Sequence, residues 1–195
     1  MAATVGLWEH FRRLATFRGR EDRARFWPYA GLAFGILTVV SAVMFLPMMA
    51  RSMEAMQAFA AQHPDQVTIV SRPGEYSISA HGAIPGLMPS RAALTLYLGV
   101  SFGLAVLLYG AAVVRRLHDR GKTGAWGLMP LPFILYSAIQ MPRMFGSLAA
   151  GGQPDLGLFF SVFFSNLLYM ASVLALIVLL AGASDPRPNR YDAGS

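Results

Sequence analysis

Residues 156–184 read LGLFFSVFFSNLLYMASVLALIVLLAGAS, a run of 29 residues without one charged side chain. About 20 apolar residues in a helix are enough to cross the hydrocarbon core of a bilayer. Because every backbone polar group in lipid must be satisfied internally, such a run has to be helical. This stretch therefore predicts a transmembrane helix, and it decides the class of the protein.

Three further charge-free stretches, at residues 26–50, 92–114 and 123–142, predict three more transmembrane helices. The third is the least regular, because Pro130 and Pro132 lie inside it and can kink a helix. Buried proline is tolerated better in a membrane helix than in water. We therefore predict an all-α membrane protein, with the 195 residues forming a single integral domain of four transmembrane helices.

The composition supports the same class of protein. Of all residues, 55% are hydrophobic and 13% are charged, whereas about 25% charged is typical of soluble domains. These proportions argue against a disordered chain, a coiled coil and an ordinary soluble enzyme. The chain contains no Cys, so structural disulfides, thiolate metal sites and Cys nucleophiles are excluded.

Basic residues divide unevenly among the segments that flank the four stretches. Twelve Lys and Arg residues lie before the first stretch, between the second and third, or after the fourth, and four lie in the other two connections. Cytoplasmic segments of membrane proteins carry such an excess. We therefore expect both termini in the cytoplasm, with residues 185–195 as a cytoplasmic tail. The same excess explains the net charge of +6 without a nucleic-acid partner.

Two segments outside the stretches have patterns of their own. Residues 4–16 place apolar and basic side chains at helical spacing, with Trp8 on the apolar face, and predict an interfacial amphipathic helix. Such a helix either binds anionic lipid head groups or only orients the first span. Residues 51–91 are expected to form an outer loop. Its start continues the first helix to Gln62, and two β-rich runs at about 66–80 predict a small hairpin.

Small and polar residues inside the stretches predict contacts between helices. Gly35 and Gly103 fall at similar depth in antiparallel helices, which predicts a close contact between the first two spans or homodimerisation through the same faces. Asn166 is expected to bond to another helix, because an unpaired amide in lipid is costly. None of the four stretches contains Asp, Glu, Lys, Arg or His, which disfavours a proton-coupled transporter.

The densest polar string joins the second and third stretches and reads RRLHDRGKTGAW over residues 115–126. If the second helix continues to Arg120, Gly121 can end it in a left-handed conformation. His118 and Asp119 also suit a general base with its orienting partner, but neither a nucleophile nor a metal-ligand set accompanies them. Every residue of the string therefore has a structural role open to it.

This string resembles the Arg-Arg-Leu-His-Asp-x-Gly-Lys-Thr-Gly signature of the bacterial membrane family called domain of unknown function 805. Residues 17–27 are similar to the family's Phe-x-Gly-Arg-x-x-Arg-x-x-Phe-Trp pattern, and residues 188–191 resemble its closing Asn-x-Tyr. After the Tyr the sequence departs, with Asp-Ala-Gly in place of Gly and Asp-Pro. The resemblance implies a multi-pass protein of the bacterial inner (cytoplasmic) membrane and no defined activity. The candidate functional residues are Gly19, Arg20, Arg23, Phe26, Trp27, Arg115, Arg116, His118, Asp119, Gly121, Trp126, Asn189 and Tyr191.

The motifs are predicted to meet at the cytoplasmic face. Arg20 and Arg23 lie one helical turn apart, and Asp119 and Asp185 are the acids best placed to receive them. We expect an Arg–Asp cluster in which the carboxylate of Asp119 lies within about 4 Å of an Arg nitrogen. Three aromatic side chains are expected to shield the cluster from water: Phe17, Trp27 and Trp126.

Three functions remain open at this point. The first is a non-enzymatic structural, interaction or envelope-associated protein with a protein partner or a homodimer. The second is a small transporter or channel subunit with a polar path near Asn166 and Tyr169. The third is an enzyme that acts on a lipid head group through His118 and Asp119.

We favour the first of these functions, with the lipid bilayer and anionic lipid head groups as partners. We predict no catalytic residue, no cofactor and no metal site. The methionines near the outer loop suit flexible apolar packing better than binding of copper.

Overall fold

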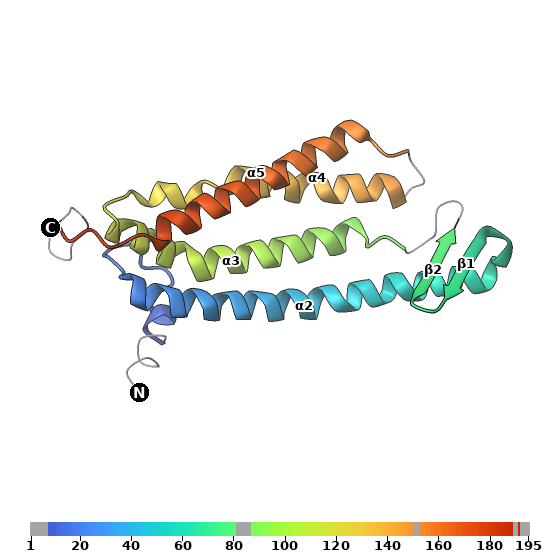
Figure 1. Cartoon of the computed structure of the whole chain (residues 1–195), viewed down its shortest axis with the longest axis horizontal. Coiled ribbons are helices and arrows are strands. Elements are labelled where there is room, and N and C mark those ends of the chain that lie inside the picture. The colour runs from blue at the N-terminus through green and yellow to red at the C-terminus, as the bar shows by residue number, and fades with distance from the viewer. Residues whose placement is uncertain (1–7, 81–86, 150–152, 189–190, 192–195) are drawn as a thin grey trace.

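The computed structural model describes residues 8–80, 87–149, 153–188 and 191. The protein is mostly helical, and its long helices lie alongside one another, with both termini at the same end (Figure 1). In chain order the helices and strands, with η for 3-10 helices, are α2 (Arg23–Gln62), η1 (Pro64–Gln66), β1 (Val67–Arg72), β2 (Glu75–Ala80), α3 (Arg91–Asp119), η2 (Gly124–Leu128), α4 (Leu131–Ala149) and α5 (Leu156–Ala181).

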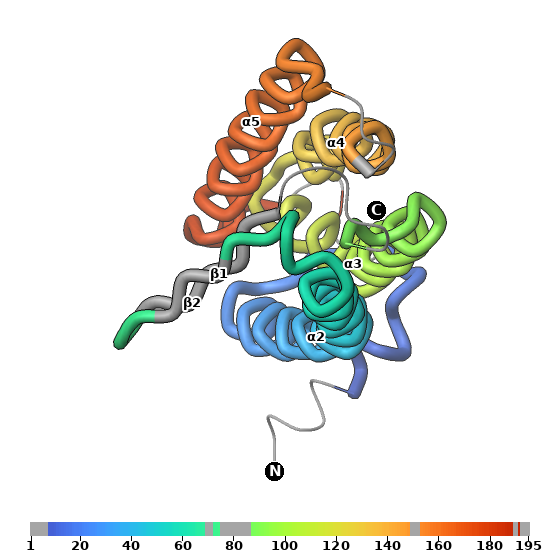
Figure 2. Tube along the Cα trace, turned by 90° about the vertical axis from the view of Figure 1, so that its right-hand side faces the viewer, coloured from blue at the N-terminus to red at the C-terminus, as the bar shows by residue number. Residues whose placement is uncertain are grey.

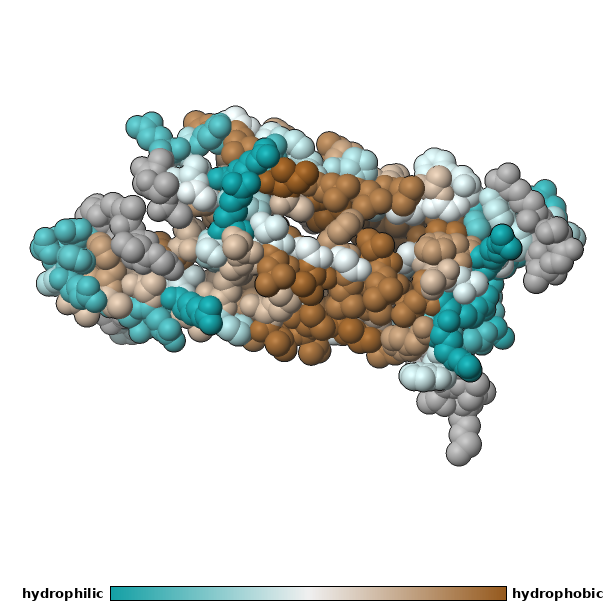
Figure 3. Space-filling view, turned by 180° about the vertical axis from the view of Figure 1, so that it is seen from behind, coloured by the Kyte–Doolittle hydropathy of each residue, from teal (hydrophilic) through white to brown (hydrophobic). Residues whose placement is uncertain are grey.

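Among the described residues, three helices are long and apolar enough to cross a membrane, namely α2, α3 and α5. Figure 3 shows the apolar side chains gathered around the middle of the molecule and the hydrophilic ones at its two ends, the pattern that a bilayer imposes. As predicted, α2 continues without a break from the first apolar stretch to Gln62. The three apolar helices are consistent with a membrane protein.

The third apolar stretch is displaced from its predicted bounds. Residues 123–142 do not form one helix, because η2 and a turn precede α4, which then runs beyond residue 142. The two prolines explain the shift. Pro130 lies just before α4 and Pro132 in its first turn, where a missing backbone N–H costs nothing. The N–H of Ile134 donates to the carbonyl of Pro130 at 3.2 Å, and the helix continues from there.

The helix α3 lies between α2 and the pair of α4 and α5 when the molecule is viewed along the helices (Figure 2). Two tyrosines fix α2 against α3 by reciprocal hydrogen bonds. The hydroxyl of Tyr29 donates to the carbonyl of Leu108 at 2.7 Å, and the hydroxyl of Tyr109 donates to the carbonyl of Ala30 at 2.8 Å. Because each bond satisfies a polar hydroxyl inside an apolar contact, the pair sets the register of the two helices.

The glycine contact predicted between the first two spans is wrong. A Cβ built on Gly31, Gly35, Gly99 or Gly103 would meet nothing within 4 Å. Buried alanines allow the close approach instead: Ala30, Ala33 and Ala112 belong to the core cluster. Small side chains of either kind permit such contacts.

Polar side chains join α4 to α5. As predicted, Asn166 bonds across the helices, because its Nδ2 donates to the hydroxyl of Ser137 at 3.3 Å. The hydroxyl of Tyr136 donates to Ser161 at 2.9 Å. The hydroxyl of Ser165 donates to the carbonyl of Phe133 at 3.0 Å. These groups pair with each other, which satisfies them in an apolar environment.

The strands β1 and β2 pair antiparallel beside the far end of α2, away from both termini (Figure 1). Arg72 pairs with Glu75, so the turn between them contains two residues, Pro73 and Gly74. Gly74 has a φ of 82°, which suits the third position of a type II turn and is unfavourable for other residues.

Candidate functional site: a buried arginine clamp

The candidate site lies at the end of the molecule that carries both termini, where α3 ends. The N–H of Gly121 donates to the carbonyl of His118 at 2.9 Å, and the N–H of Lys122 donates to that of Leu117 at 2.9 Å. With a φ of 65° at Gly121, this is a Schellman motif, as the left-handed glycine predicts. The cap directs the chain away from α3 and leaves the last turn of the helix packed inside the protein.

Arg115 binds the segment that precedes α2. Its Nε donates to Oε2 of Glu21 at 2.8 Å, and the two side chains are 1% and 6% exposed. Its Nη1 donates to the carbonyls of Arg13 and Thr16 at 3.0 and 2.6 Å. In return, the N–H of Glu21 donates to the carbonyl of Arg115 at 3.2 Å. One buried guanidinium therefore holds the whole turn that connects residues 8–12 to α2.

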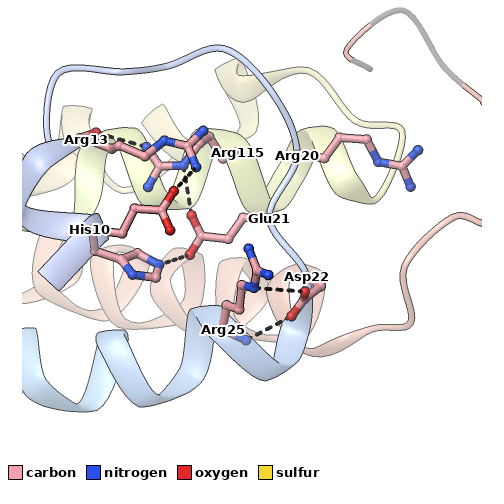
Figure 4. Close-up of a pocket in the computed structure, with 8 residues that line it drawn as sticks. His10, Arg13, Arg20, Glu21, Asp22, Arg25 and Arg115 are labelled. Atoms are coloured by element: carbon pink, nitrogen blue, oxygen red, sulfur yellow. Dashed lines mark hydrogen bonds and ion pairs between the residues drawn. The ribbon is translucent and has the colours of Figure 1, made fainter. Parts of the chain in front are cut away.

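The second carboxylate oxygen of Glu21 contacts a histidine from the N-terminal arm, the segment that precedes α2. Nε2 of His10 lies 2.6 Å from Oε1 of Glu21, and the imidazole stacks on the ring of Tyr29 with centroids 4.4 Å apart. Figure 4 shows His10, Glu21 and Arg115 converging, while Arg20 points away from them. Residues 8–12 are helical and residues 13–15 form a turn, so the helix predicted over residues 4–16 ends early, and residues 4–7 lie outside the described residues.

Arg116, the next residue in α3, binds the end of α5 instead. Its Nε donates to the carbonyl of Leu180 at 2.9 Å, and its Nη2 donates to that of Gly182. Nη1 of Arg120 donates to the carbonyl of Leu179 at 2.6 Å. The last carbonyls of a helix have no partner within it and form the negative end of its dipole, so two guanidinium groups are well suited to cap α5.

Asp119 forms ion pairs with arginines from two parts of the chain. Its Oδ2 accepts hydrogen bonds from Nη1 of Arg116 and from the hydroxyl of Ser184. Its Oδ1 lies 3.4 Å from Nε of Arg20, and the carboxylate is 7% exposed. The prediction that Asp119 lies within about 4 Å of an Arg nitrogen is confirmed.

Arg20 also binds the segment that follows α5. Its Nη2 donates to the carbonyl of Asp185 and its Nη1 to that of Arg187 at 3.3 Å. The N–H of Asp185 donates to the carbonyl of Asp119 at 2.9 Å. The side chain and backbone of Arg187 donate to the carboxylate of Asp185 and lower its pKa below the usual value. We use the name arginine clamp for this set: Arg20, Glu21, Arg115, Arg116, Asp119 and Arg120.

His118 lies beside the clamp with different partners. Its Nδ1 is 3.3 Å from the carbonyl oxygen of Gly19, and its ring stacks on Tyr191 with centroids 3.7 Å apart and an interplanar angle of 3°. Gly19 has a φ of 91°, a conformation that favours glycine. His118 and Asp119 thus both contact the segment before α2, through Gly19 and Arg20 respectively, but only Asp119 is ion-paired with arginines.

The remaining predicted residues have varied positions. Phe26 is buried at 1% exposure in the core cluster. Arg23 is exposed and, within the described part of the chain, forms neither a hydrogen bond nor an ion pair with Asp119. Phe17, Trp27 and Trp126 are 51%, 38% and 48% exposed, and their shielding of the cluster from water stays a prediction. Four members of the clamp are buried, namely Glu21, Arg115, Arg116 and Asp119. Asn189 lies outside the described residues.

Sequence reasoning missed Glu21 and His10 as members of the site. Glu21 directly follows Arg20 in the motif before α2, and an acid beside so many arginines was the available signal. Acceptors such as the carbonyls of Thr16 and Leu180 could not be found, because every residue carries a carbonyl.

A small cavity of about 50 Å³ lies against Glu21 and Arg115 (Figure 4). Its size and polar lining suit one or two water molecules. Within the described residues, no group of three His, Cys, Asp or Glu side chains is placed to hold a metal ion. The site therefore holds three segments together by ion pairs and hydrogen bonds: the N-terminal arm, the end of α3 and the segment after α5.

The fold and the clamp together define a helical protein with an apolar middle and a charge-rich end. Its family follows from comparison with known sequences. Residues 14–193 match the family described as Protein of unknown function (DUF805), so the chain belongs to that family. No curated protein and no solved structure matches the chain.

Proposed function

We propose that the protein is a non-enzymatic, four-span protein of the bacterial inner membrane, whose cytoplasmic end is a rigid surface for interaction. The observation that carries the proposal is that the arginines of the clamp bond to groups within the protein. Arg20, Arg115, Arg116 and Arg120 all direct their guanidinium groups to carbonyls or carboxylates of the protein itself. Such groups order the chain, whereas a substrate-binding site needs charged groups that face a ligand.

The four-span topology rests on two features. The helix α4 contains 19 residues, which gives a length of about 29 Å at 1.5 Å per residue, close to the hydrocarbon thickness of about 30 Å. The 12-to-4 division of basic residues favours cytoplasmic termini. Reporter fusions near residues 72 and 121 and at the C-terminus are expected to report outside, inside and inside. A cytoplasmic signal at residue 72 would overturn the orientation.

The rigid end is testable by hydrogen exchange on the full chain in nanodiscs. We expect slow exchange at the amides of Glu21 and Asp185, which donate to carbonyls of α3. Asp119→Asn removes the charge opposite Arg20 and Arg116 and should accelerate both amides. Asp65→Asn, at the opposite end of the molecule, is the control and should change neither. Fast exchange of both amides in the wild type would show that the end is not preorganised.

The alternative of an enzyme acting on lipid head groups needs His118 and Asp119 to converge in a pocket. Asp119 instead bonds to Arg116, Arg20 and Ser184, and the cavity at the clamp is lined by other residues. Incubation with vesicles of phosphatidylglycerol and phosphatidylethanolamine should give no new lipid product. A product that disappears with His118→Asn would overturn the non-enzymatic proposal.

The transporter alternative needs a polar path between the helices. The larger hollow among α3, α4 and α5 is lined mainly by apolar side chains, and its lining includes Tyr169 but not Asn166. The amide of Asn166 is already bonded to Ser137 and to the carbonyl of Val162. These observations favour an interaction protein over a transporter.

A further inference from the structure

An apolar groove of about 330 Å³ lies between α3, α4 and α5. Its walls include Ala105 and Val106 from the middle of α3, Ile134 from the first turn of α4 and Val173 from α5. Tyr109 and Tyr169 also line it, and the hydroxyl of Tyr109 donates to the carbonyl of Ala30 and so already has a partner. A groove of this lining, at this depth in the bilayer, suits an apolar chain and does not suit water.

One end of the groove reaches the level of the arginine clamp. Phe17 and Gly124 line this end, and Phe17 also packs against Gly110. Gly124 lets η2 lie directly on α3, because a Cβ there would be 2.8 Å from a methyl of Val114. The groove therefore leads from the apolar middle of the protein to its basic, charge-rich end.

Two basic residues flank this end in the sequence. Arg18 follows Phe17, and Lys122 precedes Gly124 by two residues. Within the described part of the chain, neither side chain makes an ion pair or a hydrogen bond, which distinguishes both from the arginines of the clamp. Cations at the interface attract the head groups of anionic lipids. Cations one and two positions from residues that line this end thus suit a phosphate, while the groove suits a hydrocarbon chain.

We propose that the groove binds one acyl chain of an anionic diacyl phospholipid, whose phosphate is held by Arg18 and Lys122. The volume is at the low end of ligand sites, which fits one chain and leaves the second in the bilayer. The site is separate from the clamp, and it does not depend on the interaction function proposed above, because a transporter or an enzyme with this fold would carry the same groove.

Native mass spectrometry of the full chain in detergent tests the head-group part. Dioleoyl phosphatidylglycerol and dioleoyl phosphatidylcholine have the same acyl chains but differ in head-group charge, so a difference in binding reports on the head group. We expect about tenfold tighter binding of phosphatidylglycerol. Arg18→Ala with Lys122→Ala should remove the preference. Arg12→Ala with Arg23→Ala removes the same charge from two exposed positions elsewhere and should keep the preference. No preference in the wild type, or equal loss in both double variants, overturns the proposal.

Filling the groove tests the acyl-chain part. Ala105→Phe should weaken binding of both lipids at least about tenfold, because the ring occupies the space of the chain. Leu107→Phe, on the same helix but outside the groove and 52% exposed, is the matched control and should bind as the wild type does. If Ala105→Phe does not fold, Val106→Trp fills the groove from a more exposed position. Wild-type binding in a folded groove-filling variant overturns the proposal.

Discussion

Arg115 and Arg116 are neighbours in α3, yet they bind opposite ends of the chain. Nη1 of Arg115 donates to the carbonyl of Thr16 at 2.6 Å, and Nε of Arg116 donates to the carbonyl of Leu180 at 2.9 Å. Both residues are at most 1% exposed. Because successive residues of a helix project in different directions, two adjacent arginines can hold two different segments against one helix. Arg115 and Arg116 thus connect the N-terminal arm and the end of α5 through α3.

The first prediction concerns the buried pair of Glu21 and Arg115. Glu21→Gln keeps the shape of the side chain but leaves the guanidinium of Arg115 without its opposite charge. Removal of one partner from a buried ion pair costs about 3–5 kcal/mol. We expect a large fall in the midpoint of thermal unfolding in detergent.

Glu9→Gln is the matched control for this prediction. Glu9 pairs with Arg13 at 3.4 Å, but its side chain is 54% exposed. Exposed ion pairs contribute about 0–1 kcal/mol. If both variants lower the midpoint equally, Glu21 does not form the buried pair seen here.

The second prediction concerns Gly121, which ends α3. Its φ of 65° is strained for other residues, and an added Cβ would lie 3.3 Å from the carboxylate of Asp185. We expect Gly121→Ala to destabilise the protein by about 1–2 kcal/mol. Gly146→Ala is the control, because Gly146 is helical and a Cβ there meets nothing within 4 Å. Unchanged stability of Gly121→Ala would contradict the left-handed cap.

The features that sequence reasoning predicted are local ones. A charge-free run identifies a membrane helix without reference to any other segment, and a glycine after a run of cations identifies the end of α3. One partner of Asp119 could also be predicted from the sequence, because Arg116 lies three residues away in the same helix. The family resemblance rested on such contiguous motifs, and it is confirmed.

The features that it missed depend on tertiary structure. Glu21 and Arg115 are 94 residues apart, and only the packing of the arm against α3 brings them together. Gly35 and Gly103 were misleading, because glycine is common in membrane helices whether or not it lies at a contact. The displaced start of α4 reflects two prolines whose effect depends on which of them falls in the first turn.

The third prediction concerns Gly182, where a Cβ would overlap the guanidinium of Arg120. We expect Gly182→Ala to displace Arg120 from the carbonyl of Leu179, with a loss of about 1–2 kcal/mol. Arg120→Ala should cost a similar amount. The double variant should be no less stable than either single one, because both remove the same bond. Additive losses in thermal unfolding would show that the two residues act independently.

The last prediction concerns the contact between α2 and α3, which alanines form. Gly35→Leu and Gly103→Leu should leave the midpoint of thermal unfolding unchanged, because a Cβ at either glycine meets nothing within 4 Å. Ala33→Leu should lower it, because Ala33 is 0% exposed and overpacking of a tight contact costs about 1–3 kcal/mol. The three changes each insert a leucine into the first or second apolar helix, so general effects of added volume cancel in the comparison. A loss for the glycine variants together with a stable Ala33→Leu protein would place the contact on the glycine face and reverse the arrangement of the two helices.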